Sequence, residues 1–207
     1  MTNQSVIMTK SAKTLDAKKR LILDSARRLL VAQGFQDIAL DDVARKAGVA
    51  KGTLFLYYRS KDELFTAVFA ELVQQLGREL ESVAASPRTG RALLRETVRV
   101  VLEHSDRNRD FLSQFGVGRF PACGPRSCRK LMALTGENIR RIVRILRLCA
   151  EQGAIRAQDL DAAAFALFGL CRSAVSHRLV TGKEKPLDER AGLILKLFLY
   201  GVSGKPC

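Results

Sequence analysis

The chain has 207 residues and a formal net charge of +14, from 35 Lys and Arg against 21 Asp and Glu. That charge favours polyanionic partners such as nucleic acid or acidic membrane surfaces. No apolar run reaches membrane-spanning length, no segment has the form of a signal peptide, and the five cysteines are an odd number, so we expect a cytoplasmic protein with reduced thiols and no membrane association.

The first predicted helix ends at Gly34. Ile22, Ala26 and Leu30 recur along it at helical spacing, and Gly34 follows as a left-handed cap. A basic cluster precedes or opens this helix: Lys10, Lys13, Lys18, Lys19 and Arg20. As a flexible arm the cluster would add sequence-independent phosphate contacts, and as a solvated tail it would only aid solubility, so both interpretations stay open.

A second, short helix is predicted from about Asp41 to Ala47. An aspartate in its first turn favours the positive end of the helix dipole, and Gly48 supplies a sharp turn after it. A third helix follows at about Lys51–Tyr58. This spacing is typical of a helix-turn-helix, in which the helix after the turn is the recognition helix that enters the major groove of DNA.

The remainder of the chain is predicted to be helical. Ser60 and Glu63 form a capping box that begins a fourth helix at Lys61. That helix is expected to end near Ala85, and the later ones to span about 86–105, 107–116, 127–153, 159–181 and 187–202, with a loop at 116–125. We therefore predict an all-α fold of about nine helices, with a basic arm and helix-turn-helix domain at 1–61 and a second helical domain at 62–207.

The last two predicted helices are apolar over much of their surface. One short domain cannot easily bury both, whereas pairing with a second copy would make a four-helix interface with twofold symmetry. An ordinary monomeric core is the alternative. The predicted dimer residues are Phe165, Val175, Leu179, Ile194, Leu195 and Phe198. A twofold dimer would place two recognition helices on a palindromic operator.

The N-terminal third resembles the TetR family of transcriptional regulators. The motifs that carry the resemblance are Gly34-Phe35, Val43-Ala44, Ala47-Gly48-Val49, Lys51-Gly52-Thr53-Leu54 and Ser60-Lys61. Their agreement in order and spacing makes the match specific. The resemblance implies a dimer with a helix-turn-helix at each N-terminus and a helical C-terminal domain that binds an inducing ligand.

Three positions depart from the family pattern. Ala39 lacks the hydroxyl of the usual Thr or Ser, Phe55 stands where Tyr is common, and Tyr57 stands where His is common. We expect phosphate anchoring by Tyr57, Lys61 and backbone amides, and base or phosphate contacts from the start of the recognition helix. The predicted DNA-binding residues are Lys51, Gly52, Thr53, Phe55, Leu56, Tyr57 and Lys61.

The sensor half has no chemical signature. In a family-like layout the candidate pocket residues are His104, Phe111, Phe115, Asn138, Phe168 and Arg172, although an aromatic stripe is also typical of a core. Arg140, Arg144 and Arg147 share about one face of a helix, which fits an anionic effector or a solvated surface. No metal motif, cofactor motif or catalytic motif is recognisable, so we expect no metal, no cofactor and no enzymatic activity.

The sequence predicts a ligand-responsive transcriptional repressor that a small-molecule effector releases from its DNA operator. One alternative is an architectural DNA-binding protein without a sensor, since positive charge alone gives salt-sensitive binding. Another is a thiol redox sensor on the same scaffold, because Cys123 and Cys128 lie five residues apart in the predicted loop. The effector, the operator and the sign of regulation are left open.

Overall fold

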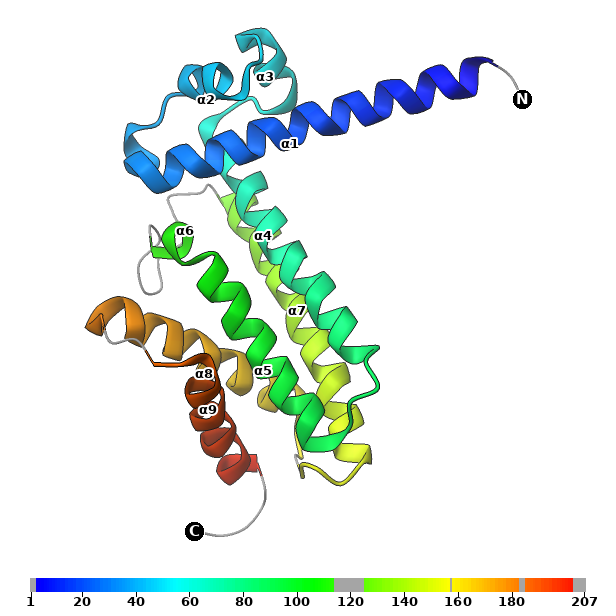
Figure 1. The fold of residues 1–207 in the computed structure, drawn as a ribbon, viewed down its shortest axis with the longest axis vertical. Coiled ribbons are helices and arrows are strands. Elements are labelled where there is room, and N and C mark those ends of the chain that lie inside the picture. Colours follow the sequence, from blue (N-terminus) through cyan, green and yellow to red (C-terminus); the bar gives the residue numbers. More distant parts are fainter. Residues whose placement is uncertain (1–2, 114–124, 157, 183–184, 203–207) are drawn as a thin grey trace. The chain divides into compact units, whose positions relative to one another are not determined.

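The computed structural model describes residues 3–113, 125–156, 158–182 and 185–202, with side chains from Ala17 onward apart from positions 113, 178, 179 and 200–202. Nine α-helices and no strand lie in these ranges, which confirms the predicted all-α fold (Figure 1). The helices are α1 (Asn3–Asp37), α2 (Leu40–Ala47), α3 (Lys51–Tyr57), α4 (Lys61–Ala84), α5 (Gly90–Arg107), α6 (Arg109–Ser113), α7 (Pro125–Glu151), α8 (Leu160–Thr181) and α9 (Leu187–Val202).

The chain forms two compact units. Unit 1 comprises Met1–Glu71 with Arg119–Arg129, and unit 2 comprises Leu72–Gly118 with Lys130–Cys207. Helices α4 and α7 each have residues in both units. The functional boundary predicted after residue 61 stays a prediction.

Helix α1 is longer than the sequence predicted. It begins at Asn3, so the described part of the basic arm is helical backbone and not a flexible tail. Gly34 has a positive φ of 77°, as expected of a helix stop. The helix nevertheless resumes after this kink and ends at Asp37. The ring of Phe35, next to the kink, packs edge-on against Phe65 of α4, with 4.8 Å between the ring centroids.

The start of α4 follows the predicted capping box in part. The Glu63 backbone N–H donates to Ser60 Oγ at 3.1 Å, which satisfies one free amide of the first turn. The Glu63 carboxylate accepts the N–H of Arg59 at 2.9 Å and not that of Ser60. The prediction that the helix begins at Lys61 is confirmed.

Helix α5 starts later than predicted. The Ser86 backbone N–H donates to the Val83 carbonyl at 3.1 Å, which prolongs the last turn of α4, so Pro87 lies in the connection and not in a first helical turn. Helix α7 begins at Pro125, ahead of the predicted cap at Ser127. The Ser127 hydroxyl instead donates to Asp62 Oδ2 at 3.1 Å.

In unit 2, α5 packs against both α8 and α9, which also pack against each other. Fully buried leucines and isoleucines from α4, α5 and α7 fill the centre of the core, among them Leu80, Leu94, Leu102, Ile142 and Leu146. Gly77 of α4 allows a close approach of α7, because a Cβ there would lie 2.8 Å from Asn138 Oδ1. Asn138 Nδ2 donates to the Val73 carbonyl at 2.9 Å, so the two helices are also tied by a hydrogen bond.

Candidate DNA-binding site

The turn between α2 and α3 is closed by main-chain hydrogen bonds. Gly48 adopts the left-handed conformation, with φ 66° and ψ 31°. The Val49 N–H donates to the Ala44 carbonyl at 3.0 Å and the Gly48 N–H to the Arg45 carbonyl at 3.2 Å, which is the pattern of a Schellman motif. The helix-turn-helix geometry predicted from Gly48 is therefore present.

Helix α3 has an inner and an outer face. Leu54 is fully buried, and Tyr58, directly after the helix, is 4% exposed, so these two side chains fix α3 on the rest of unit 1. Thr53 and Tyr57 are half-buried. The outer face consists of the exposed residues Lys51, Gly52, Phe55 and Leu56.

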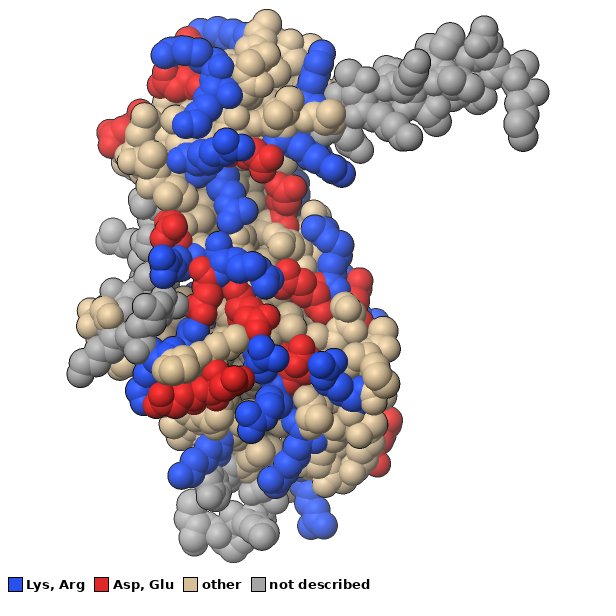
Figure 2. All heavy atoms as spheres, in the orientation of Figure 1, with Lys and Arg blue, Asp and Glu red and all other residues tan. Residues whose placement is uncertain are grey.

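Acidic side chains of α2 hold the nearby cations in place. Lys51 Nζ lies 2.8 Å from Asp41 Oδ2, and Arg45 Nη2 lies 2.8 Å from Asp42 Oδ1. Both pairs are open to solvent, so each contributes little to stability and is readily exchanged for another anion. Figure 2 shows Lys and Arg distributed over the whole visible face, interspersed with Asp and Glu, so the net charge is not confined to this site.

Lys61 and Tyr58, near the recognition helix, differ in how their polar groups are satisfied. Lys61, a predicted phosphate anchor, donates to the Gln36 carbonyl at 2.8 Å and lies 4.8 Å from the centre of the Phe35 ring. The Tyr58 hydroxyl is buried and makes no hydrogen bond, and burial, followed by the charges of Glu71 and Glu63, raises its pKa to about 12. Ala39 precedes α2 without a side-chain cap, as its missing hydroxyl predicts.

The predicted sensor residues are dispersed through unit 2. His104, Phe111 and Asn138 are buried, whereas Phe168 is half-buried and Arg172 is exposed. The imidazole Nδ1 of His104 lies 3.2 Å from Glu79 Oε2. Phe115 lies outside the described residues.

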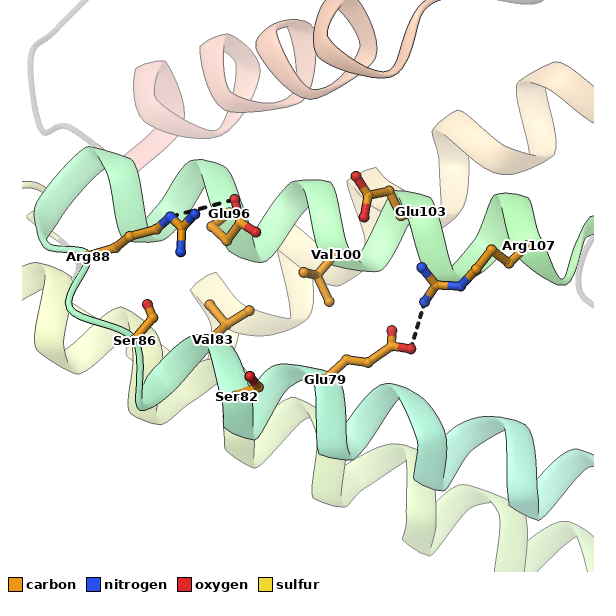
Figure 3. Close-up of a pocket in the computed structure, with 9 residues that line it drawn as sticks. All are labelled: Glu79, Ser82, Val83, Ser86, Arg88, Glu96, Val100, Glu103 and Arg107. Atoms are coloured by element: carbon orange, nitrogen blue, oxygen red, sulfur yellow. Dashed lines mark hydrogen bonds and ion pairs between the residues drawn. The ribbon is translucent and has the colours of Figure 1, made fainter.

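A groove of about 330 Å³ lies along α4 and α5 (Figure 3). Its lining residues are Glu79, Ser82, Val83, Ser86, Arg88, Glu96, Val100, Glu103 and Arg107. Val83 and Val100 lie in its middle, between an Arg107–Glu79 hydrogen bond of 2.6 Å and an Arg88–Glu96 ion pair of 3.8 Å. None of the predicted sensor residues that the structure describes lines this groove, although His104 contacts Glu79, which does. Sequence reasoning missed the groove because charged residues at helical spacing are typical of a solvated surface.

The predicted dimer residues divide into two groups. Ile194, Leu195 and Phe198 are buried in the core of unit 2 itself, so they have little apolar area left for a partner. Phe165 is 68% exposed and Val175 is half-buried. The side chain of Leu179 lies outside the described residues. The sequence did not single out Leu193 and Leu197 for the interface, yet both are about half exposed on α9.

Arg140, Arg144 and Arg147 are all exposed. Cys123 lies outside the described residues, and Cys128 is half-buried. Within the described parts of the chain, no group of three or more His, Cys, Asp or Glu side chains has the placement of a metal site, and no helix is long and apolar enough to cross a membrane.

Residues 22–68 match the family model of bacterial regulatory proteins, tetR family. The chain is 39% identical over 61 residues to the HTH-type transcriptional regulator SrpR of Pseudomonas putida, which covers 30% of this chain and 29% of SrpR. It is 35% identical over 83 residues to the HTH-type transcriptional regulator AcrR of Shigella flexneri, which covers 40% of this chain and 39% of AcrR. Each of the first curated relatives is matched over less than half of its length.

Solved structures share the fold over most of the chain. The transcriptional regulator FadR of Bacillus subtilis, solved in complex with stearoyl-CoA, superposes with a TM-score of 0.74 at 20% sequence identity. The superposition covers 88% of this chain and 98% of FadR. The family model thus covers the helix-turn-helix, while similarity of fold extends over most of the chain.

Proposed function

We propose that this chain, which belongs to the TetR family of transcriptional regulators, is a homodimeric repressor released from a palindromic operator by a small-molecule effector. The observation that carries the proposal is the Schellman turn at Gly48, which sets α3 after α2 as in a helix-turn-helix. Lys51 supports it as an exposed cation at the start of α3, held by an ion pair that a phosphate would replace at little cost.

The proposed dimer uses the exposed apolar side chains of α8 and α9. Phe165, Leu193 and Leu197 leave more than half of their surface open in one copy of the chain. Exposed apolar area of this kind is removed from water when a second copy packs on it. A twofold pair of recognition helices would then contact two half-sites one helical turn of DNA, or a multiple of it, apart.

The proposed effector site is the groove along α4 and α5. Its apolar middle and charged ends favour a short effector with ionic groups, such as one that displaces Arg107 from Glu79. A long acyl chain such as that of stearoyl-CoA, which the FadR structure contains, would require a deeper apolar channel than this lining offers. Because α4 also has residues in unit 1, a shift of this helix on effector binding would alter the separation of the two recognition helices.

The first experiment selects bound sites from random duplex DNA at near-physiological salt and sequences them. We expect a palindrome with two half-sites. Recovery of no common site would remove the repressor proposal and leave an architectural DNA-binding protein, which the net charge of +14 would favour.

The second experiment uses the recovered operator as a fluorescent probe in a screen of small ionic compounds. If an effector lowers the affinity for operator by some factor, operator must lower the affinity for effector by the same factor. Glu103→Gln should weaken the response to effector, while Arg144→Gln, outside the groove, should not. An unchanged response in Glu103→Gln would place the effector elsewhere.

A further inference from the structure

The outer face of the recognition helix is largely apolar. Leu56 is 86% exposed, the highest value among the large hydrophobic side chains described, and Phe55 beside it is 39% exposed. Neither side chain has a hydrogen-bond donor or acceptor. A leucine with this exposure is in contact with water and not with the core of unit 1, so its apolar area is available for contact with a ligand.

Hydrogen-bonding side chains are scarce on the same face. Lys51 is the only charged residue of α3, and its ammonium group lies 2.8 Å from Asp41. Gly52 carries no side chain, and a Cβ placed on it would meet nothing within 4 Å, so bases can approach the main chain closely there. The face therefore offers base edges an apolar surface with few polar groups.

We propose that Leu56 and Phe55 read the C5-methyl groups of thymines in the major groove. Among the four bases only thymine presents a methyl group there, and apolar side chains distinguish it from cytosine without any hydrogen bond. The cations Arg45, Lys46 and Lys51 lie on this helix-turn-helix, and the solvent-open pairs that Arg45 and Lys51 make with Asp42 and Asp41 can be exchanged for DNA phosphates. DNA is therefore the occupant of this face, and the inference rests on the proposed function.

The test replaces thymine by deoxyuridine in the selected operator, one symmetric pair of positions at a time. Deoxyuridine keeps every hydrogen-bonding group of thymine and lacks only the methyl. Loss of one buried methyl in each half-site should weaken binding by the full-length protein about fifteenfold, from about fourfold per methyl. We expect this loss at one or two pairs of positions and no loss at the others.

The variant Leu56→Ala assigns the methyl contact to its side chain. This variant should bind the thymine operator more weakly and show no further loss with deoxyuridine at the Leu56 position, whereas Leu56→Met should retain most of the sensitivity. Leu21→Ala removes another half-exposed leucine of unit 1 outside α3 and should leave both affinities unchanged. Circular dichroism of each variant checks that folding is intact.

The outcomes separate the inference from the function beneath it. An operator that binds equally well with thymine and deoxyuridine would overturn the methyl contact while leaving a sequence-specific regulator. Deoxyuridine sensitivity that persists in both Leu56→Ala and Phe55→Ala would assign the methyl contact to other residues and also overturn the inference. A failed selection would remove the proposed function and the inference together.

Discussion

Unit 1 and unit 2 use their polar side chains in different ways. In unit 2, His104, Asn138 and Arg190 are buried and tie helices to one another. In unit 1 the buried polar residues described are Ser25 and Thr66, and no charged residue described there is fully buried. Most charged side chains of unit 1 are thus open to solvent, while unit 2 uses some of its own to hold distant segments together.

Unit 2 has hydrogen bonds between residues far apart in the sequence, as unit 1 has between Ser127 and Asp62, whereas the turn at Gly48 is closed locally. The Asn138–Val73 hydrogen bond of unit 2 joins residues 65 apart, and the Arg190–Asp106 pair joins residues 84 apart. The turn at Gly48 is closed by bonds to residues three to five positions earlier. A substitution in the turn of unit 1 should therefore act locally, whereas one in unit 2 should loosen whole helices.

The largest effect is expected at Arg190, whose side chain is 9% exposed and whose guanidinium donates to Asp106 Oδ1 at 3.1 Å. Arg190→Met removes the buried guanidinium that pairs with Asp106 and should lower the free energy of unfolding by about 3 kcal/mol in urea titrations. Lys185→Met breaks the exposed ion pair with Glu189 and should change the free energy of unfolding by less than about 0.5 kcal/mol. Equal effects would remove the distinction between buried and exposed pairs.

The next effect concerns the α4–α7 crossing. Gly77→Ala places a Cβ 2.8 Å from Asn138 Oδ1, and since Asn138 is held by Val73, the helices must separate. We expect a loss of about 2 kcal/mol in the same assay. Gly136→Ala, whose Cβ would meet Arg140 at 3.7 Å, should instead stabilise α7 by about 0.5–1 kcal/mol. A stabilised Gly77→Ala variant would show that the crossing is looser than described.

A smaller, local effect is expected in unit 1. Gly48→Ala has free space around its Cβ, so the cost of about 1 kcal/mol comes only from the left-handed backbone. Gly52→Ala lies inside α3 with equal space and should stabilise the free protein by about 0.5–1 kcal/mol. Thermal unfolding measures the stability of the two variants. A loss of stability in both would mean that side-chain crowding, and not the backbone angle φ of Gly48, governs this turn.

The smallest effect at neutral pH is expected for Tyr58→Phe, which removes a buried hydroxyl that has no hydrogen bond. We expect a gain of up to about 1 kcal/mol. The pKa of Tyr58 is raised from 10.0 to about 12, so below pH 10 the phenol is protonated in both folded and unfolded chains. Between pH 10 and 12 only the unfolded chain releases the proton, and stability falls as pH rises.

The pH series compares the parent with Tyr58→Phe at each pH. Burial also raises the pKa of the Cys149 thiol to about 11 and of the Cys171 thiol to about 12. These two thiols of unit 2 therefore lower the stability of both the parent and the Tyr58→Phe variant as pH rises above 9. These thiol contributions cancel in the comparison. A difference that stays constant from pH 9 to 12 would contradict the raised pKa of Tyr58.

The helix-turn-helix could be predicted because its signals are local. Gly48 allows a conformation that other residues resist, and Ser60 provides a hydroxyl three residues before a free amide, so each signal needs only its neighbours. One helix boundary that was wrong involves a distant atom. Ser127, predicted to begin α7, bonds Asp62 instead, a residue 65 positions away.

The candidate sites were less predictable for the same reason. The sequence does not reveal that Lys61 reaches the Gln36 carbonyl or that Lys51 pairs with Asp41. An apolar helix face also does not show which of its residues face the core. Ile194 is buried, whereas Leu193, one position earlier, is half exposed. The predicted dimer residues therefore included both core positions and exposed positions.

The Schellman turn bears on how such a regulator diversifies over evolution. Its hydrogen bonds join backbone atoms only, so Arg45 and Val49 contribute their main chains, and Gly48 is the one position in the turn with a conformational demand. Outward residues such as Lys51 and Leu56 do not hold the turn closed. Substitutions there can accumulate without refolding the domain, and a duplicated gene can acquire a new operator while its scaffold stays the same.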